Sequence, residues 1–124
     1  MAIYVDGFVI PVPRKNLAKY KKMARQVGKV CCEYGAIEYI ESVADDVKKG
    51  KVTSFPRSVK LKAGETVIFS FILYKSRAAR DAANKKIMKD PRMAKLMDKK
   101  NMPFDGKRLF MGGFKAFLHL KKSR

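Results

Sequence analysis

The 124-residue chain contains one histidine, two cysteines and no long apolar run. His119 and the adjacent Cys31 and Cys32 are too few for the usual metal sites, which need three or four clustered ligands. No stretch approaches the roughly 20 apolar residues of a membrane-spanning helix. Asp6 and Pro11 interrupt the N-terminal segment where the apolar core of a secretion signal would lie. We therefore expect no metal, no cofactor, no membrane contact and a cytoplasmic location.

The residue types of nucleophilic catalysis are equally scarce. A triad-type mechanism needs a base beside its nucleophile, and the single histidine, His119, lies near the C-terminus. Cys31 and Cys32 are neighbours within a helical pattern, which does not favour a bridge between them. They are typical of reduced thiols in a cytosolic protein. The sequence thus shows no recognisable catalytic constellation, and whether the protein is an enzyme stays open.

Acidic residues are also few, 11 against 29 lysines and arginines, for a net charge of +18. Residues 14–34 hold seven basic residues and one acid, and residues 75–100 hold ten and three. Both stretches have helical periodicity, so the helices carry most of the charge, which favours solubility and attraction to polyanions. RNA or another nucleic acid would bind through its phosphates, without sequence reading. This candidate nucleic-acid face consists of Lys15, Lys19, Lys22, Lys29, Lys85 and Lys89.

Hydrophobic residues make up 47% of the chain, enough for one globular domain over residues 1–124. Residues 3–12 predict an apolar strand that prolines 11 and 13 end. Residues 16–34 repeat apolar side chains every three or four positions, which predicts a helix, and Gly35 follows where a helix cap is expected. Residues 36–44 predict a less apolar strand at an edge of the sheet.

The second half of the chain repeats this order. A polar connection over residues 45–64, with a short strand at 58–61, leads to residues 66–74, which are apolar on both faces and predict a central strand. Ser76 is placed to cap a helix that runs to Lys89. Pro91 breaks that helix, and a short one follows over 92–99. Residues 107–120 predict the last strand, with a bulge at glycines 112 and 113.

The order β-α-β-β-α-β predicts an α+β fold of the ferredoxin-like type, a four-stranded antiparallel sheet with two helices on one face. The third and fourth strands are apolar on both faces, whereas the chain's own helices cover only one. A large exposed apolar face needs a cover, and an identical subunit is the simplest one. We therefore expect a homodimer, associated through the sheet face, of the dimeric α/β-barrel kind.

An RNA-recognition module is the main alternative, because such modules share this strand order and stack bases on aromatic side chains. Residues 3–8, I-Y-V-D-G-F, and 69–74, F-S-F-I-L-Y, partly match its two strand motifs. The third-strand motif, however, has Val67 and Ile68 where a basic residue and a glycine belong. About 60 residues separate the two stretches, and Asp6 would place a negative charge among phosphates. Ordinary buried strand aromatics explain the pattern better.

Asp6 is the most unusual residue of the first strand, because a carboxylate among apolar residues must pair, protonate or reach solvent. One interpretation is a buried ion pair that stabilises the fold or the dimer, and its candidate partners are Arg80, Arg108 and Lys115. The other is a polar anchor for a small-molecule ligand in a pocket between sheet and helices. That candidate pocket consists of Asp6, Phe8, Phe104, Arg108 and Phe114.

Five sequence blocks in the same order resemble the YbaA-like family of bacterial domains of unknown function. They are Y-V-D-G-F at 4–8, R-D-A-A-N-K-K at 80–86, D-P-R-M at 90–93, M-P-F-D-G-K-R at 102–108 and G-G-F at 112–114. The resemblance covers about residues 3–118 and implies a dimeric α/β-barrel fold without an established activity. Relatives in that superfamily include small monooxygenases, isomerases and haem proteins. This chain departs from the family pattern in its high basicity and its K-K-S-R tail.

Overall fold

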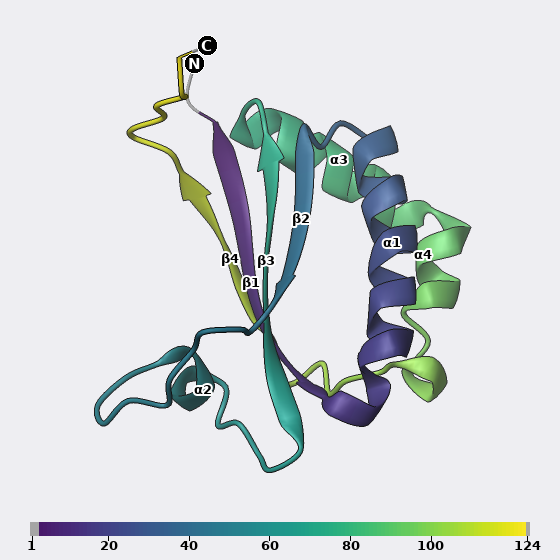
Figure 1. Ribbon diagram of the computed structural model, residues 1–124. Helices are drawn as coiled ribbons and strands as arrows, with labels where there is room; N and C mark the ends of the chain where they lie inside the picture. The colour runs from purple at the N-terminus through teal and green to yellow at the C-terminus, as the bar shows by residue number, and fades with distance from the viewer. Residues whose placement is uncertain (1–2, 124) are drawn as a thin grey trace.

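The computed structural model describes residues 3–123, and its centre is one antiparallel sheet (Figure 1). The four strands lie in the order β2-β3-β1-β4 and comprise β1 (Tyr4–Pro13), β2 (Glu38–Val43), β3 (Glu65–Tyr74) and β4 (Phe110–Lys115). The two central strands, β1 and β3, are ten residues long and pair over their whole length. This confirms the predicted α+β, ferredoxin-like arrangement.

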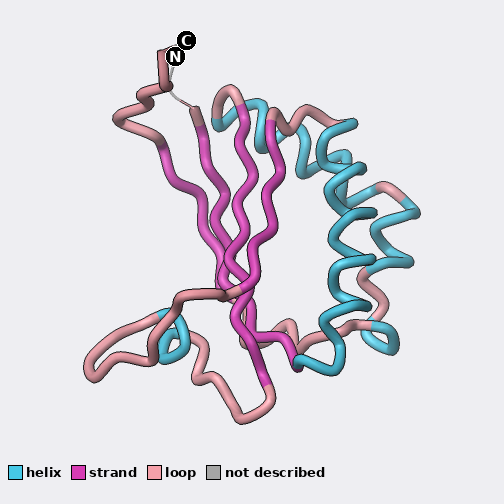
Figure 2. Tube along the Cα trace, in the orientation of Figure 1, coloured by secondary structure: helices cyan, strands magenta, loops and turns pink. Residues whose placement is uncertain are grey.

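Three helices lie on one side of the sheet, α1 (Leu17–Glu33), α3 (Arg77–Lys89) and α4 (Pro91–Leu96). The sequence predicted two helices there, and α4 joins them because it packs against both α1 and α3. Short 3₁₀ turns precede α1 (η1, Arg14–Asn16) and follow α4 (η2, Lys99–Asn101). Figure 2 shows the strands as one continuous layer with these helices on one side of it.

The helix ends follow local capping chemistry. Gly35, after α1, has φ 120°, a conformation that glycine adopts at little cost. The Ser76 hydroxyl accepts a hydrogen bond from the Ala79 backbone N–H and so starts α3. Asp90 caps α4 in the same way through the Arg92 N–H, with Pro91 in the first turn. Pro91 therefore ends one helix and starts the next, as its position predicts.

The connection between β2 and β3 contains a short helix rather than the predicted strand at 58–61. Helix α2 (Phe55–Ser58) begins at Ser54, whose side chain accepts a hydrogen bond from the Arg57 backbone N–H. Pro56 in the first turn fits a helix start, because its missing N–H has no helical partner there anyway. The cap and the proline together explain why this segment turns instead of extending.

Two predictions about strand ends are corrected. Strand β1 continues through Pro11 to Pro13, and Pro11 pairs with Val67 of β3. The last strand ends at Lys115 instead of residue 120, because its partner β1 begins at Tyr4, which pairs with Lys115. Beyond Lys115 the chain has no paired β1 residue with which to form strand hydrogen bonds.

The predicted bulge at glycines 112 and 113 is absent, since β4 pairs with β1 residue by residue from Phe110 to Lys115. The structure gives Gly113 a different role. A Cβ atom at Gly113 would lie 2.4 Å from the Tyr4 hydroxyl oxygen and 2.7 Å from its ring. Glycine here lets the Tyr4 ring lie flat across the sheet.

The two faces of the sheet differ sharply. Alternate residues of β1 and β3, such as Tyr4, Val12 and Tyr74, point toward the helices and are buried there. The opposite side, which we call the open face, presents the partly exposed side chains of Ile40 (37%), Phe69 (42%), Phe110 (47%) and Phe114 (65%).

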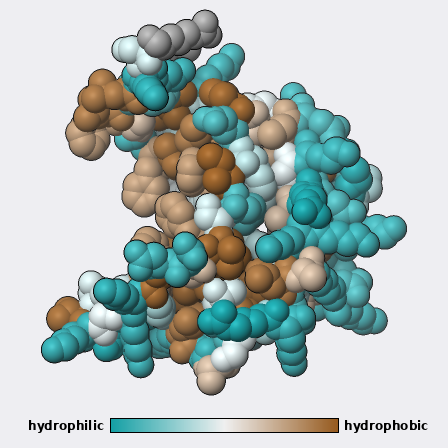
Figure 3. Space-filling view, viewed as in Figure 1, coloured by the Kyte–Doolittle hydropathy of each residue, from teal (hydrophilic) through white to brown (hydrophobic). Residues whose placement is uncertain are grey.

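Two segments flank the open face. The α2 segment, residues 44–64, lies at one end and the C-terminal segment, residues 116–123, at the other (Figure 1). Both carry exposed apolar side chains, among them Val52 (86%), Phe117 (97%) and Leu120 (82%). Figure 3 shows a hollow on this side of the molecule, with mainly hydrophobic side chains above it and a mixture of hydrophobic and hydrophilic side chains below it. The open face and its two flanks thus all expose apolar side chains, although the α2 segment also carries exposed charged residues.

Candidate functional site

The candidate site is built around Asp6, on the helix-covered face of the sheet. Asp6 is 3% exposed, and its Oδ1 accepts a hydrogen bond of 2.9 Å from Nη1 of Arg80 on α3. Nη2 of Arg80 lies 3.2 Å from the Tyr4 hydroxyl, and the guanidinium carbon is 4.8 Å from the centre of the Tyr4 ring. Tyr74 of β3, opposite Tyr4, completes the group that we call the Asp6 centre.

Local structure positions these side chains. Strand alternation puts Tyr4 and Asp6 on the same face of β1, two residues apart. The Ser76 cap sets the first turn of α3, and the Arg80 backbone N–H bonds to the Ser76 carbonyl at 3.1 Å. Arg80 therefore points from the first turns of α3 toward the sheet. Gly113 lies opposite Asp6 on β4 and leaves the space that Tyr4 fills.

Burial dominates the electrostatics of the centre. It raises the pKa of Asp6 more than the neighbouring Arg80 charge lowers it, and nearby Asp81 adds to the rise. Burial also raises the pKa of Tyr74 to about 12 and that of Cys31 to about 11, with charge interactions among these groups contributing. A carboxyl group with a raised pKa beside a guanidinium can orient a bound polar molecule and exchange a proton with it.

The Tyr74 hydroxyl is the least satisfied group of the centre. Tyr74 is fully buried, yet its hydroxyl has no hydrogen-bond partner within residues 3–123. Leaving a buried hydroxyl without a partner costs about 1–3 kcal/mol, so such groups are rare. This hydroxyl marks a position where a polar partner would be stabilised.

The centre lies near the β4 edge of the sheet. The Arg80 side chain is 15% exposed, and Asp81 beside it accepts a hydrogen bond from Arg80 Nε and is half exposed. Gly113, next to the Tyr4 ring on β4, is exposed to solvent. The Tyr4 ring, itself buried, therefore covers the centre at the β4 edge of the sheet.

Neither of the other candidate partners forms an ion pair with Asp6 among the described residues. Arg108 forms a bidentate pair with Glu65 at the opposite end of β3, and it also donates to the carbonyl oxygens of Val59 and Lys60. This pair lowers the pKa of Glu65 and raises that of Arg108. Lys115 is exposed on β4, opposite Tyr4. Arg108 precedes β4 in a turn rather than lying within the strand, which takes it away from Asp6.

The structure also separates the residues of the predicted pocket. Phe8 packs between two parts of the helix-side core, but Phe104 contacts Tyr20 in an edge-to-face pair near the start of α1. Phe114 lies on the open face and is 65% exposed. The last strand is shorter than predicted, and its alternation directs Phe114 away from Asp6. Asp6 thus shares its strand face with Phe8, as predicted, but has Tyr4, Tyr74 and Arg80 near it in place of Phe104 and Phe114.

The six lysines of the predicted nucleic-acid face fall into three groups. Lys19, Lys22 and Lys29 line a groove between α1 and the α4 region, together with Arg92 and Lys95. The others lie outside this groove, Lys15 in η1 and the pair Lys85 and Lys89 on α3. The structure therefore concentrates half of the predicted face in one groove.

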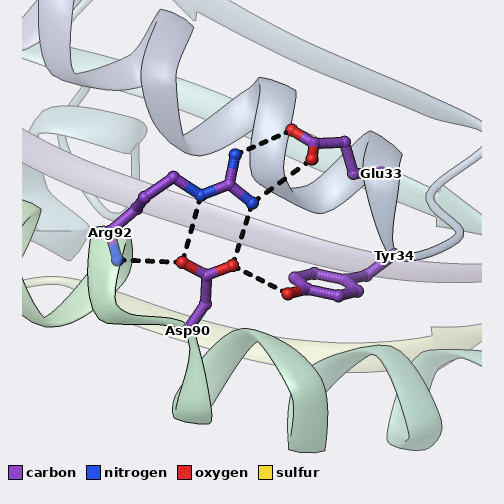
Figure 4. Close-up of polar contacts among 4 residues, drawn as sticks. All are labelled: Glu33, Tyr34, Asp90 and Arg92. Atoms are coloured by element: carbon purple, nitrogen blue, oxygen red, sulfur yellow. Dashed lines mark hydrogen bonds and ion pairs between the residues drawn. The ribbon is translucent and has the colours of Figure 1, made fainter.

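A second polar cluster joins α1 to α4 (Figure 4). The buried Asp90 carboxylate accepts hydrogen bonds from the Tyr34 hydroxyl at 2.7 Å and from the Arg92 guanidinium. Arg92 also donates to both carboxylate oxygens of Glu33. The Arg92 and Tyr34 hydrogen bonds hold the pKa of Asp90 well below its usual range. This cluster fixes α4 against the end of α1.

A third polar cluster lies between α1 and β2. Glu41 accepts hydrogen bonds from the hydroxyls of Tyr20 and Tyr39, and it borders a cavity of about 720 Å³. Gly28 allows the close approach, because a Cβ atom there would lie 2.7 Å from the Tyr39 ring. Both tyrosine hydroxyls donate their hydrogen to Glu41. Burial raises the pKa of each tyrosine. The cluster thus attaches the edge strand to α1.

Sequence reasoning missed Tyr74 and the partners of Asp90. Tyr74 ends an apolar run in which every position looks buried, so the pattern did not distinguish its hydroxyl. The pairing of its strand with β1, which places Tyr74 opposite Tyr4, is the signal that would have singled it out. Tyr34 and Asp90 are 56 positions apart in sequence, and only helix packing brings them together.

Three further findings concern residues 3–123 as a whole. Within residues 3–123 there is no group of three or more histidine, cysteine or acidic side chains arranged to hold a metal ion. No helix in this part of the chain has the length and apolar character needed to cross a membrane. Cys31 is buried and Cys32 exposed, and neither is in a disulfide.

Comparison with protein families finds that residues 3–106 match the family described as "Protein of unknown function (DUF1428)". The Escherichia coli K12 protein described as "Uncharacterized protein YbaA" is 46% identical over 115 residues, which cover 93% of this chain and 97% of that protein. A Shigella flexneri protein with the same description matches equally well.

Solved structures of low sequence identity share the fold. A "dimeric ferredoxin-like protein" from an uncultured marine organism has a TM-score of 0.62 at 8% identity and covers 97% of this chain and all of that one. A "nipsnap family protein with unknown function" from Agrobacterium tumefaciens has a TM-score of 0.58 at 12% identity, with 92% and 87% of the two chains covered. The blocks at 4–8, 80–86 and 112–114 that carry the family resemblance meet at the Asp6 centre.

Proposed function

Because the chain belongs to the YbaA-like family of proteins of unknown function (DUF1428), we propose that it is a homodimer that binds a small polar molecule at the Asp6 centre. Its two subunits associate through their open faces. We place the dimer in the cytosol, where Cys31 and Cys32 stay reduced.

The open face supports the dimer. Phe69, Phe110 and Phe114 expose aromatic surface that a monomer would leave in water, and burial of each ring is favourable. A second copy offers the same surface, and the flanking segments can extend over the partner. The fold neighbour described as a dimeric ferredoxin-like protein is in keeping with this association.

The buried Tyr74 hydroxyl is the observation that carries the ligand proposal. It lacks a partner within residues 3–123, and it lies in the same core cluster as the ring of Tyr4, which Arg80 contacts. A small molecule with a hydrogen-bonding group would satisfy this hydroxyl and share the Arg80 donors with Asp6. The Tyr4 ring beside Gly113 would have to move for entry, so the ligand enters from the β4 edge.

Native mass spectrometry of protein purified without added ligand tests both parts. We expect twice the chain mass plus a bound small molecule for the wild type, and the dimer mass alone for Asp6→Asn. Asn keeps the shape of Asp6 but removes the charge that holds Arg80 in place.

Glu65→Gln is the matched control, because it alters a second partly buried arginine–carboxylate pair far from the centre. It should keep both the dimer and the bound mass. A monomeric wild type refutes the dimer, and a bound mass that Asp6→Asn retains refutes the site.

The alternative is a nucleic-acid accessory protein that acts through the basic helical face. One observation favours it, the alignment of Lys19, Lys22 and Lys29 along one groove. Titration with single-stranded RNA at two salt concentrations tests this alternative. Binding that weakens steeply with salt would support it, and no binding at low salt would exclude it.

A further inference from the structure

The groove between α1 and the α4 region is a second candidate site, with a volume of about 630 Å³. That volume falls within the range of small-molecule sites. Its lining residues come from α1, from α4 and from the segment after α4, which contributes Asn101 and Pro103. The Asp6 centre is built instead from β1, β3 and α3. Figure 1 shows α1 and α4 side by side on the outer side of the molecule. We call this feature the α1–α4 groove.

The rim of the α1–α4 groove is cationic and its floor is apolar. Lys19, Lys22 and Lys29 on one side face Lys95 on the other. Every ion pair among the described residues uses an arginine, so these lysines keep their charge unneutralised. The apolar lining consists of Met23, Val30, Leu96 and Pro103.

Polar contacts hold both ends of the groove in place. At one end, Arg92 joins Glu33 of α1 to Asp90 at the start of α4 (Figure 4). At the other, the Asn16 side-chain amide donates a 3.0 Å hydrogen bond to the Pro103 carbonyl. The two walls are therefore fixed before any ligand binds, which lowers the entropic cost of binding.

The dimensions and the floor select the ligand class. Lys19 and Lys29 are ten residues apart on α1, about 15 Å along the helix axis, so the groove is long for its volume. No aromatic side chain of the described residues lines it. Proteins that bind single-stranded nucleic acid commonly add base stacking on aromatic side chains to their phosphate contacts, which this lining does not offer, whereas an aliphatic chain fits a floor of Met23 and Leu96.

We propose that the α1–α4 groove binds a single-chain anionic amphiphile such as a long-chain carboxylate. The head group pairs with Lys22 and Lys95, and the alkyl chain lies along Met23 and Leu96. The positive rim provides selectivity for anions, and the apolar floor provides affinity that grows with chain length.

Calorimetric titration of the full chain with dodecanoate tests this proposal. We expect one bound molecule per chain and no comparable binding of dodecylammonium, which has the same chain with the opposite charge. The double variant K22E/K95E should weaken dodecanoate binding by about tenfold or more, equivalent to about 1.4 kcal/mol.

Two matched controls separate the groove from diffuse charge and from nonspecific apolar contact. K85E/K86E changes the net charge by the same amount as K22E/K95E, but on α3 outside the groove. It should alter the affinity for dodecanoate by less than about twofold. Met23→Gln should weaken binding severalfold, whereas Met88→Gln on the exposed face of α3 should not change it.

The proposal is overturned if dodecanoate does not bind, if dodecylammonium binds equally well, or if the two double variants weaken binding equally. A short single-stranded RNA that binds more tightly than dodecanoate and displaces it would assign the groove to nucleic acid instead.

Discussion

The two faces of the sheet reverse the usual distribution of polar and apolar groups. The helix-covered face holds a buried carboxylate, Asp6, and a buried phenol without a partner, Tyr74. The open face holds no charge near its centre, where Phe69, Phe110 and Phe114 are partly exposed. The covered face is therefore the more polar of the two at its most buried positions.

The two faces differ in how their unfavourable groups, a buried charge on one and exposed aromatic rings on the other, are accommodated. The carboxylate of Asp6 is tolerated because α3 of the same chain brings Arg80 to it, which offsets part of the desolvation cost. On the open face Phe69 contacts the rings of Phe55 and Phe71 and is still 42% exposed, because the chain's three larger helices lie on the other side of the sheet. The covered face is completed within one chain, whereas the exposed rings of the open face are the basis of the proposed association with a second copy.

The largest effect should come from a charge placed on the open face. We expect Phe114→Asp to convert the dimer to monomers, because a carboxylate buried at an apolar interface loses its hydration. Met111→Asp is the control, since Met111 is on the same strand but points to the other face and is 59% exposed. Light scattering gives the mass of each, and a dimeric Phe114→Asp would contradict the open-face interface.

A smaller effect should follow from removing the cation of the covered face. Arg80→Met should lower the free energy of unfolding by about 3 kcal/mol, because Asp6 is left buried without its partner. Arg77→Met breaks an exposed pair with Asp81 on the same helix and should cost less than about 1 kcal/mol.

Urea denaturation measures both changes. The double variant Asp6→Asn/Arg80→Met should recover most of the lost stability, since it leaves no isolated charge. Equal losses for Arg80→Met and Arg77→Met would show that the Asp6 pair behaves as a surface pair.

The contact between Tyr4 and β4 should be sensitive to a single methyl group. Gly113→Ala should lower stability by about 2 kcal/mol, because the new Cβ overlaps the Tyr4 ring. At Gly112 the nearest atom to a Cβ, in Phe114, is at an ordinary 3.6 Å, so Gly112→Ala should change stability by less than about 0.5 kcal/mol. Thermal unfolding compares the two, and equal effects would mean that Tyr4 moves aside freely.

The smallest predicted change is an increase in stability, at Tyr74. Tyr74→Phe should raise the free energy of unfolding by about 1 kcal/mol, because it removes a buried hydroxyl that has no partner within residues 3–123. Tyr34→Phe should lower it, since the Tyr34 hydroxyl donates to Asp90. Both are measured by urea denaturation of ligand-free protein. A loss of stability in Tyr74→Phe would show that this hydroxyl already has a partner.

Most of the fold could be predicted from the sequence because its signals are local. The apolar periodicity of α1, the Ser76 cap of α3 and the break at Pro91 each depend on neighbouring residues. The strand predicted at 58–61 missed the local cap of α2, whereas the two errors about the last strand depend on a partner distant in sequence. The last strand ends where β1 begins, and Gly113 accommodates Tyr4 without a bulge.

The candidate site was less accessible to sequence reasoning. Asp6 stood out because a carboxylate in an apolar strand is conspicuous on its own, and Arg80 was one of three possible partners. The choice among Arg80, Arg108 and Lys115 depends on where α3 packs and where β4 begins, which no local pattern encodes. Phe104, Phe114 and Arg108 were therefore placed near Asp6 although they lie elsewhere.

The sequence by itself determined the order of strands and helices, the excess of positive charge and the need to accommodate one carboxylate, because composition and short-range periodicity set these properties. Only the tertiary structure decided that Arg80 contacts Asp6, that the Tyr74 hydroxyl is left without a partner, and that lysines of α1 and α4 border one groove. The reason is that a strand or helix specifies which side chains share a face, whereas the packing of one element on another specifies which of those side chains meet.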